Sequence, residues 1–240
     1  MIHERSRTRH IGILACSSEG AALCYRTICL EGASLLGPFG HPEISIHTHP
    51  LSRYVAHLSA GDWPGVAELM RVSAEKLAAA GADFLICPDN TIHAALPFLG
   101  GELPLPLLHI AEVVSDHAAG RGLHRVGLLG TAYLVESDVY RDKLAARGVQ
   151  LVRPTPSERA EIHRVIMDEL VRGITSQHAI EVLQGVMNRM KQDGCDGAIL
   201  GCTEIPLVID DTNAPLPTLD STRLLARAAL WRAVTTADAS

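Results

Sequence analysis

One motif occurs twice in the sequence, and this repeat limits the possible folds more than any other feature of the chain. The first copy runs from Gly81 to Thr91 and the second from Gly194 to Glu204. Glycine, aspartate, isoleucine and a terminal polar residue stand at 81, 83, 86 and 89, and again at 194, 196, 199 and 202. Each copy contains an apolar run typical of a buried strand. Asp89 and Cys202 are therefore expected just past the carboxyl ends of two strands, where open α/β sheets bind ligands.

A second match extends the repeat toward the start of the chain. Ile11-Gly12-Ile13-Leu14 resembles Val126-Gly127-Leu128-Leu129, and both segments lead into a short polar loop. Gly12 and Gly127 are 115 residues apart, and Asp89 and Cys202 are 113 apart. Unrelated buried strands would not be expected to share nearly the same offset, so the sequence predicts two similar halves.

Predicted strands and helices alternate along the chain, which indicates an α/β fold with a parallel sheet in each half. The predicted first lobe comprises residues 1–115 and 215–240, and the second comprises 116–214. The helix 157–172 is expected to begin with a pattern like a capping box, Ser157 and Glu161, although the acid stands four rather than three residues after the serine. The predicted strands are 10–16, 44–48, the run ending at 87, 105–110, 126–129, 149–152 and 198–200. The predicted helices are 20–32, 63–80, 91–99, 111–119, 134–147, 157–172, 179–193 and 222–234.

Composition and motifs exclude several classes of function. Twenty-seven acidic against 21 basic residues give a net charge of −6, which argues against a nucleic-acid partner. No apolar run approaches the roughly 20 residues that span a bilayer. The polar start, Met1 to Arg7, lacks the apolar core of a signal peptide, so we expect a cytoplasmic protein with no membrane partner. Six cysteines without a CxxC pair favour reduced thiols. No HExxH, Cys/His cluster, GxGxxG or P-loop occurs, so neither a metal nor a nucleotide cofactor is expected.

The polar ends of the two repeats resemble the paired signatures of a known family. Asp89-Asn90-Thr91-Ile92-His93 and Gly201-Cys202-Thr203-Glu204 are similar to Cys-Asn-Thr-x-His and Gly-Cys-Thr-Glu. These are the first-lobe and second-lobe signatures of the aspartate/glutamate racemases, in the Asp/Glu/hydantoin racemase superfamily. The likeness continues through 11–14, 107–111, 128–131 and 157–160, and so covers nearly the whole chain.

The resemblance implies two pseudo-symmetric Rossmann-like lobes with the active site in the cleft between them. Family members use no pyridoxal phosphate: one cysteine removes the α-proton of a small carboxylate and the other reprotonates the opposite face. Relatives are commonly dimers, which implies a homodimer here. Asn90, Thr91 and Thr203 match family positions that hold the substrate carboxylate, and Ser17 and Thr131 lie in the corresponding glycine-rich loops. From the sequence itself, we also expect His47 as a polar group of the substrate pocket, with a purely structural histidine as the alternative.

The sequence departs from the family at Asp89, which stands where most members carry the first cysteine. In model peptides aspartate has a pKa of about 3.9 and cysteine of about 8.5, so Asp89 is expected to rest as a base and Cys202 as an acid. Asp89 could instead cap the helix that follows it, or do both. Cys202 could be a small core residue. Many relatives bind the distal carboxylate of the substrate with a lysine or arginine, but Ala160 and Glu161 stand near that place in the second lobe of this chain. The resemblance therefore does not single out plain aspartate as the substrate.

Three functions fit this pattern. The first is a cofactor-independent amino-acid racemase that acts at the α-carbon of an aspartate- or glutamate-like carboxylate, with proton transfer between Asp89 and Cys202. The second is a decarboxylase or lyase of the arylmalonate decarboxylase type, with Cys202 as its single acid. The third is a non-catalytic protein that binds a small acid.

Overall fold

The computed structural model describes residues 8–235, which form two compact units. The first unit contains the chain up to Pro88, residues 95–109 and the chain from Leu225; the second contains 89–94 and 110–224. The lobes expected from the sequence assigned 89–94, 110–115 and 215–224 to the first half instead. The segment that begins at Asp89 thus belongs with the second unit, as does Cys202.

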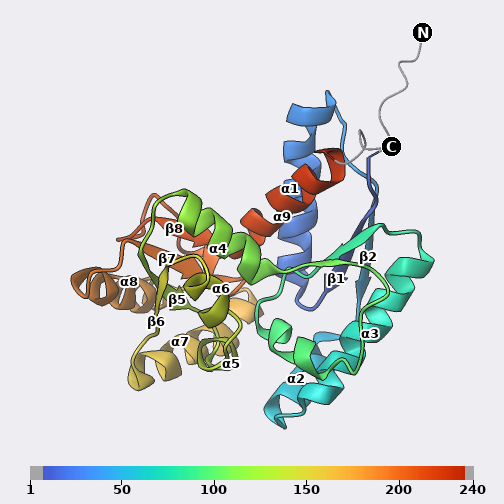
Figure 1. Cartoon of the computed structure of the whole chain (residues 1–240). Helices are drawn as coiled ribbons and strands as arrows, with labels where there is room; N and C mark the ends of the chain where they lie inside the picture. The colour runs from blue at the N-terminus through green and yellow to red at the C-terminus, as the bar shows by residue number, and fades with distance from the viewer. Residues whose placement is uncertain (1–7, 236–240) are drawn as a thin grey trace. The chain divides into compact units, whose positions relative to one another are not determined.

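The first unit is built on a four-stranded parallel sheet of order β2-β1-β3-β4 (Figure 1). The central strand β1 pairs with both β2 and β3, with Ile11 opposite Ile44 and Phe84. Helix α3 packs on β1 and β2, and α1 and α9 lie side by side, joined by an ion pair between Glu31 and Arg227. The elements are β1 Ile11–Ala15, α1 Ser18–Leu36, β2 Ile44–Thr48, α2 Leu51–Ser59, α3 Trp63–Ala79, β3 Phe84–Ile86, η1 Thr91–Phe98, β4 Leu107–Leu108 and α9 Ser221–Thr235; η1 and α9 each run from one unit into the other.

The second unit repeats this design, with a parallel sheet of order β6-β5-β7-β8. Its strand order matches that of the first sheet position by position, which confirms the predicted α/β fold of two similar halves. The elements are α4 Ile110–Gly120, β5 Arg125–Leu129, α5 Ala132–Glu136, α6 Arg141–Ala145, β6 Gln150–Val152, α7 Pro156–Asp168, η2 Leu170–Arg172, α8 Gln177–Gln192, β7 Gly197–Leu200, η3 Ile205–Leu207 and β8 Thr218–Asp220.

Alternating side chains of β5 and β7 divide the core of the second unit into two layers. One layer contains buried residues of α7 and α8, and the other contains buried residues of α4, α5 and α6 (Figure 1). The strand residues facing α7 and α8 are Leu129, Ala198 and Leu200; those facing the other layer are Val126, Leu128 and Ile199. Burial of both faces explains why these strands are continuously apolar in the sequence.

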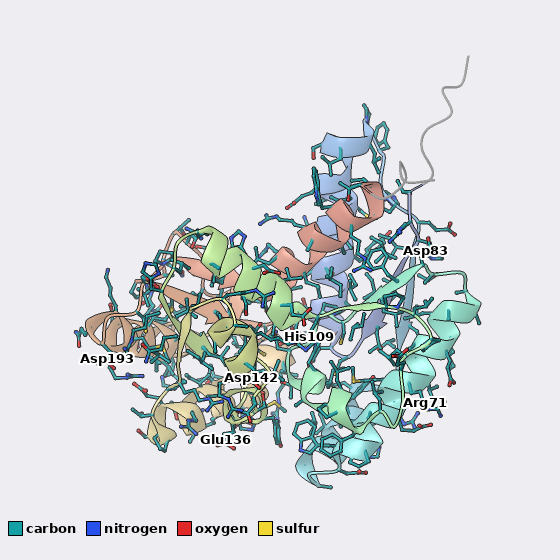
Figure 2. All side chains as sticks on the ribbon, viewed as in Figure 1. Arg71, Asp83, His109, Glu136, Asp142 and Asp193 are labelled. Atoms are coloured by element: carbon teal, nitrogen blue, oxygen red, sulfur yellow. The ribbon has the colours of Figure 1, made fainter. Side chains whose placement is uncertain are left out.

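The spacing that the two copies of the repeat share has the same structural explanation in each unit. Gly81 and Gly194 have φ of +89° and +86°, a left-handed turn that favours glycine. The carboxylate of Asp83, labelled in Figure 2, accepts the backbone N–H of His10 at 2.6 Å, just before β1. Asp196 likewise accepts the backbone N–H of His124 at 2.7 Å, just before β5. In both units the motif therefore joins the starts of the two central strands.

The single helix predicted over 134–147 is wrong, because the structure has two short helices there, α5 and α6. The Ser137 hydroxyl donates to the Leu134 carbonyl at 2.7 Å, and Arg153 donates to the Ser137 carbonyl. These side chains satisfy backbone groups that a continuous helix would use, and so end α5. The break places Tyr140 at the start of α6.

The capping box predicted at Ser157 and Glu161 is also wrong, and the true one lies earlier. Thr155 is the N-cap of α7: its hydroxyl accepts the Glu158 N–H, and the Glu158 carboxylate accepts the Thr155 N–H at 2.8 Å. Pro156 then occupies the first helical turn, where its missing N–H costs nothing. Thr155 and Glu158 stand three residues apart, the spacing that a capping box requires.

Candidate active site

Cys202 lies two residues beyond β7, and Gly201 makes that position possible. The Gly201 N–H donates to the Leu129 carbonyl at 2.7 Å, which ties it to the end of β5. A Cβ on Gly201 would lie 2.7 Å from the Leu134 side chain and 2.9 Å from that carbonyl. Only glycine allows this approach, so the chain can turn here and present the half-buried Cys202 at the carboxyl end of the sheet.

The environment of Cys202 favours its thiol form. Desolvation raises the pKa of Cys202 well above its ordinary value, although the residue keeps some exposed surface. The charge of Glu204, the hydrogen bond that Cys202 Sγ donates to Glu204 Oε2 at 3.0 Å, and the charge of Asp89 raise that pKa further. The thiol is therefore favoured over the thiolate at neutral pH, and the role of Cys202 as a catalytic acid stays a prediction.

Asp89 follows β3 by three positions and is half-buried. Its Oδ1 accepts the Ile92 N–H at 3.1 Å, which caps η1. The charge of Asp89 also contributes to the raised pKa of Cys202, after desolvation and Glu204. The structure thus contains the cap, and the role of Asp89 as a base stays a prediction.

Asn90 is buried, and its side-chain amide is held from both ends. Tyr140 OH donates to Asn90 Oδ1 at 2.5 Å, and Asn90 Nδ2 donates to Ser221 Oγ at 2.9 Å. Ser221 Oγ in turn donates to the Leu200 carbonyl at 2.8 Å. No pattern in the sequence indicated Tyr140 or Ser221: Tyr140 stands inside a wrongly predicted helix, and Ser221 belongs to no motif.

The remaining second-unit candidates also cluster by hydrogen bonding. Thr91 Oγ1 and Thr131 Oγ1 are 3.0 Å apart, and Thr131 caps α5 by accepting the Leu134 N–H. Thr203 Oγ1 donates to Glu204 Oε2 at 2.7 Å, the same oxygen that accepts from Cys202. All three threonines are buried. The second unit thus contains hydroxyl groups beside each of the two proton-transfer candidates.

Ser17 and His47 belong to the first unit. Ser17 is the N-cap of α1 and accepts the Gly20 N–H at 3.2 Å, the same role that Thr131 has after β5. His47 contacts α3 through both ring nitrogens, Nδ1 with Ser73 Oγ at 2.9 Å and Nε2 with Lys76 Nζ at 3.1 Å. Desolvation, Lys76 and His49 lower the pKa of His47, so its ring is neutral and links the edge strand β2 to α3.

His163 of α7 is a site candidate that the sequence did not indicate. Its Nδ1 accepts the Ala132 N–H at 3.3 Å, next to Thr131, and its ring meets that of Tyr133 edge-on at 5.3 Å. Desolvation lowers the pKa of His163, against smaller opposing effects of Asp168 and Glu136. A neutral ring whose Nδ1 accepts carries its proton on Nε2.

Within residues 8–235, no three or more His, Cys, Asp and Glu side chains gather in a way that could hold a metal ion. No helix in this part of the chain has both the length and the apolar character needed to cross a membrane.

Known proteins resemble this chain in sequence and in structure. The broad specificity amino-acid racemase RacX of Bacillus subtilis is 27% identical over 161 residues, which span 64% of this chain and 66% of RacX. A crystal structure of a candidate Asp/Glu racemase from Yersinia pestis has a TM-score of 0.85 and 30% identity, with 95% of this chain and 100% of that one covered. An aspartate racemase homologue from Pyrococcus horikoshii has a TM-score of 0.79 and 25% identity, with 94% and 99% covered.

The curated relatives are only partly matched in length, since the chain spans about two thirds of RacX and about half of the glutamate racemases. The family model described as Asp/Glu/hydantoin racemase, in contrast, matches residues 13–229. That stretch includes both repeats and both sheets, so the chain belongs to the Asp/Glu/hydantoin racemase family.

Proposed function

We propose that this protein is a cofactor-independent amino-acid racemase that transfers protons between Asp89, Cys202 and the α-carbon of a small carboxylate substrate. The observation that carries the proposal is that Asp89 and Cys202, at equivalent places in the repeat, belong to one compact unit, where the Cys202 thiol is hydrogen-bonded to Glu204. Inverting a carbon needs a base on one face and an acid on the other. Asp89 and Cys202 supply these two groups.

In one direction, Asp89 takes the α-proton, and the electron pair of the broken C–H bond delocalises into the substrate carboxylate. Cys202 then gives its thiol proton to the opposite face and becomes a thiolate. The proton that has arrived on Asp89 removes one of the two negative charges that disfavour this thiolate. The two transfers therefore assist each other. Proton return through solvent and Glu204 resets the pair.

The substrate carboxylate gains negative charge as the proton leaves, so it needs hydrogen-bond donors in fixed positions. The buried Thr91–Thr131 pair is suited to this role, because one hydroxyl donates to the other and the second keeps its hydrogen for the substrate. Thr203 gives its hydroxyl hydrogen to Glu204, so it could contribute only by accepting or after that hydrogen bond changes. Relatives in sequence include a broad specificity amino-acid racemase and glutamate racemases, which supports an amino-acid substrate.

Decarboxylation is the second candidate, and the protonated state of Cys202 favours it. A decarboxylase of this kind needs one acid to protonate an enolate on one face, and it needs no base. Asp89 would then serve only as the cap of η1.

A screen in heavy water separates these functions. Aspartate, glutamate, other amino acids and small dicarboxylic acids are incubated with the wild type, with Cys202→Ser and with Cys29→Ser, a control for loss of a half-buried thiol in the first unit. Racemisation predicts α-deuterium uptake with inversion, and its loss only in Cys202→Ser. Release of CO₂ would favour the decarboxylase. Ligand binding without either reaction would overturn both enzymatic proposals in favour of a binding protein.

A further inference from the structure

The hydrogen bonds around Asn90 form a chain in which each donor can be assigned. Ser221 has one hydroxyl hydrogen, which it gives to the Leu200 carbonyl, so it must accept from Asn90 Nδ2. This orients the amide, leaving Asn90 Oδ1 to accept from Tyr140 OH. Asn90, Tyr140 and Ser221 are 2%, 1% and 0% exposed, so water does not compete for these groups.

The chain connects segments that are distant in sequence and adjacent to the two proposed proton-transfer groups. Asn90 directly follows Asp89, and Leu200 ends β7 two residues before Cys202. Ser221 follows β8 directly, and Leu200 pairs with Asp220 in the sheet, which fixes the hydroxyl against its carbonyl. The far end, Tyr140, is held at the start of α6.

We infer that Tyr140 and Ser221 are positioning residues, which act through Asn90 to hold the Asp89 carboxylate in place beside the Cys202 thiol. The cap that Asp89 forms with the Ile92 N–H fixes its carboxylate relative to η1. The Tyr140–Asn90–Ser221–Leu200 chain ties the next residue to the end of β7, two residues before Cys202. The expected effect on catalysis rests on the proposed function. The claim that Tyr140 and Ser221 position the Asp89 segment does not depend on that function.

The expected catalytic consequence is a loss in the proton-transfer step. Tyr140→Phe removes the buried hydroxyl that donates to Asn90 Oδ1. Because that oxygen then lacks its hydrogen-bond donor, the segment that contains Asp89 can shift. Misplacement of a reacting group by about 1 Å can reduce turnover by about a hundredfold. We therefore expect kcat to fall by about ten- to a hundredfold, with KM nearly unchanged.

A measurement without substrate tests the geometry itself. The pH dependence of Cys202 alkylation by iodoacetamide, followed at the Cys202 peptide by mass spectrometry, reports the thiol pKa. Because the Asp89 charge raises that pKa, a shifted Asp89 lowers the midpoint. Tyr140→Phe should lower the alkylation midpoint, as Asp89→Asn should, and the shift should be no larger than that of Asp89→Asn. In the Asp89→Asn background, Tyr140→Phe should cause no further change, since the two act through one interaction.

Tyr54→Phe is the matched control, because Tyr54 is a fully buried tyrosine of the first unit. It should leave the midpoint unchanged. Ser221→Ala provides a second probe and should act like Tyr140→Phe. An unchanged midpoint in folded Tyr140→Phe and Ser221→Ala would overturn the inference, as would a shift that persists with Asp89→Asn. If the two variants lower the alkylation midpoint but the wild type has no racemase activity, the positioning role would stand and the proposed function would be rejected.

Discussion

The thiol of Cys202 and the carboxylate of Glu204, two residues apart in sequence, are joined by a hydrogen bond of 3.0 Å. Glu204 is buried and also accepts from Thr203. The carboxylate is thus fixed against the sulfur and opposes formation of a thiolate. It is the strongest side-chain influence on the protonation of Cys202.

Glu204→Gln should make Cys202 more reactive toward iodoacetamide near neutral pH. The neutral amide removes the negative charge, which is the largest side-chain contribution to the raised pKa of Cys202, so the alkylation midpoint moves to lower pH. Glu161→Gln removes a carboxylate paired with Arg164 on the surface of α7 and should have no effect. A midpoint that did not move in Glu204→Gln would contradict the role assigned to Glu204.

The raised pKa of Cys202 also predicts how stability depends on pH. Above the ordinary thiol pKa, the unfolded chain loses this proton while the folded protein retains it, so the free energy of unfolding falls as pH rises. One group contributes at most about 1.4 kcal/mol per pH unit. In alkaline urea titrations, Cys202→Ser should show a shallower fall than the wild type. Parallel curves for the two proteins would count against the raised pKa.

Two substitutions at Asp89 separate its cap from its chemistry. Asparagine keeps an oxygen that can accept the Ile92 N–H, so Asp89→Asn should retain stability and lose activity. Asp89→Ala loses both, and removing a cap costs about 1 kcal/mol. Urea denaturation measures the difference. Equal destabilisation by Asn and Ala would show that the cap requires the negative charge.

The capping box of α7 gives a test far from the site. Thr155→Ala should lower the free energy of unfolding by about 1 kcal/mol, because the Glu158 N–H loses its acceptor. Ser157→Ala, at an exposed position, should change it by less than about 0.5 kcal/mol. If the Ser157 variant were the less stable one, the sequence-based assignment would be the better of the two.

The sequence was most informative where one local rule decided the outcome. Apolar runs with a common offset were enough to predict two similar parallel sheets, and the strand ends located Asp89 and Cys202. It failed where side chains compete with the backbone: Ser137 breaks a helix whose periodicity is continuous. The strand predicted over 105–110 is limited to Leu107–Leu108 in β4. Pro104 and Pro106 precede it and have no N–H to donate to a neighbouring strand, which explains its late start.

The positioning chain could not be predicted for a different reason. Tyr140, Asn90 and Ser221 are separated by up to 131 residues, and no spacing rule connects them. His163 likewise reaches Ala132 only because α7 packs against α5. Residues of this kind are defined by tertiary contacts, whereas Asp89 and Cys202, the proposed catalytic pair, are defined by their motif.

Exchange of the α-hydrogen in heavy water, measured from each enantiomer of the best substrate with the wild type and Asp89→Asn, tests the central claim most directly. The account predicts that the wild type exchanges both enantiomers with inversion and that Asp89→Asn loses at least about a hundredfold in rate, the usual contribution of a positioned acid or base. A rate for folded Asp89→Asn equal to that of the wild type would contradict it, because the base would then have to be another group.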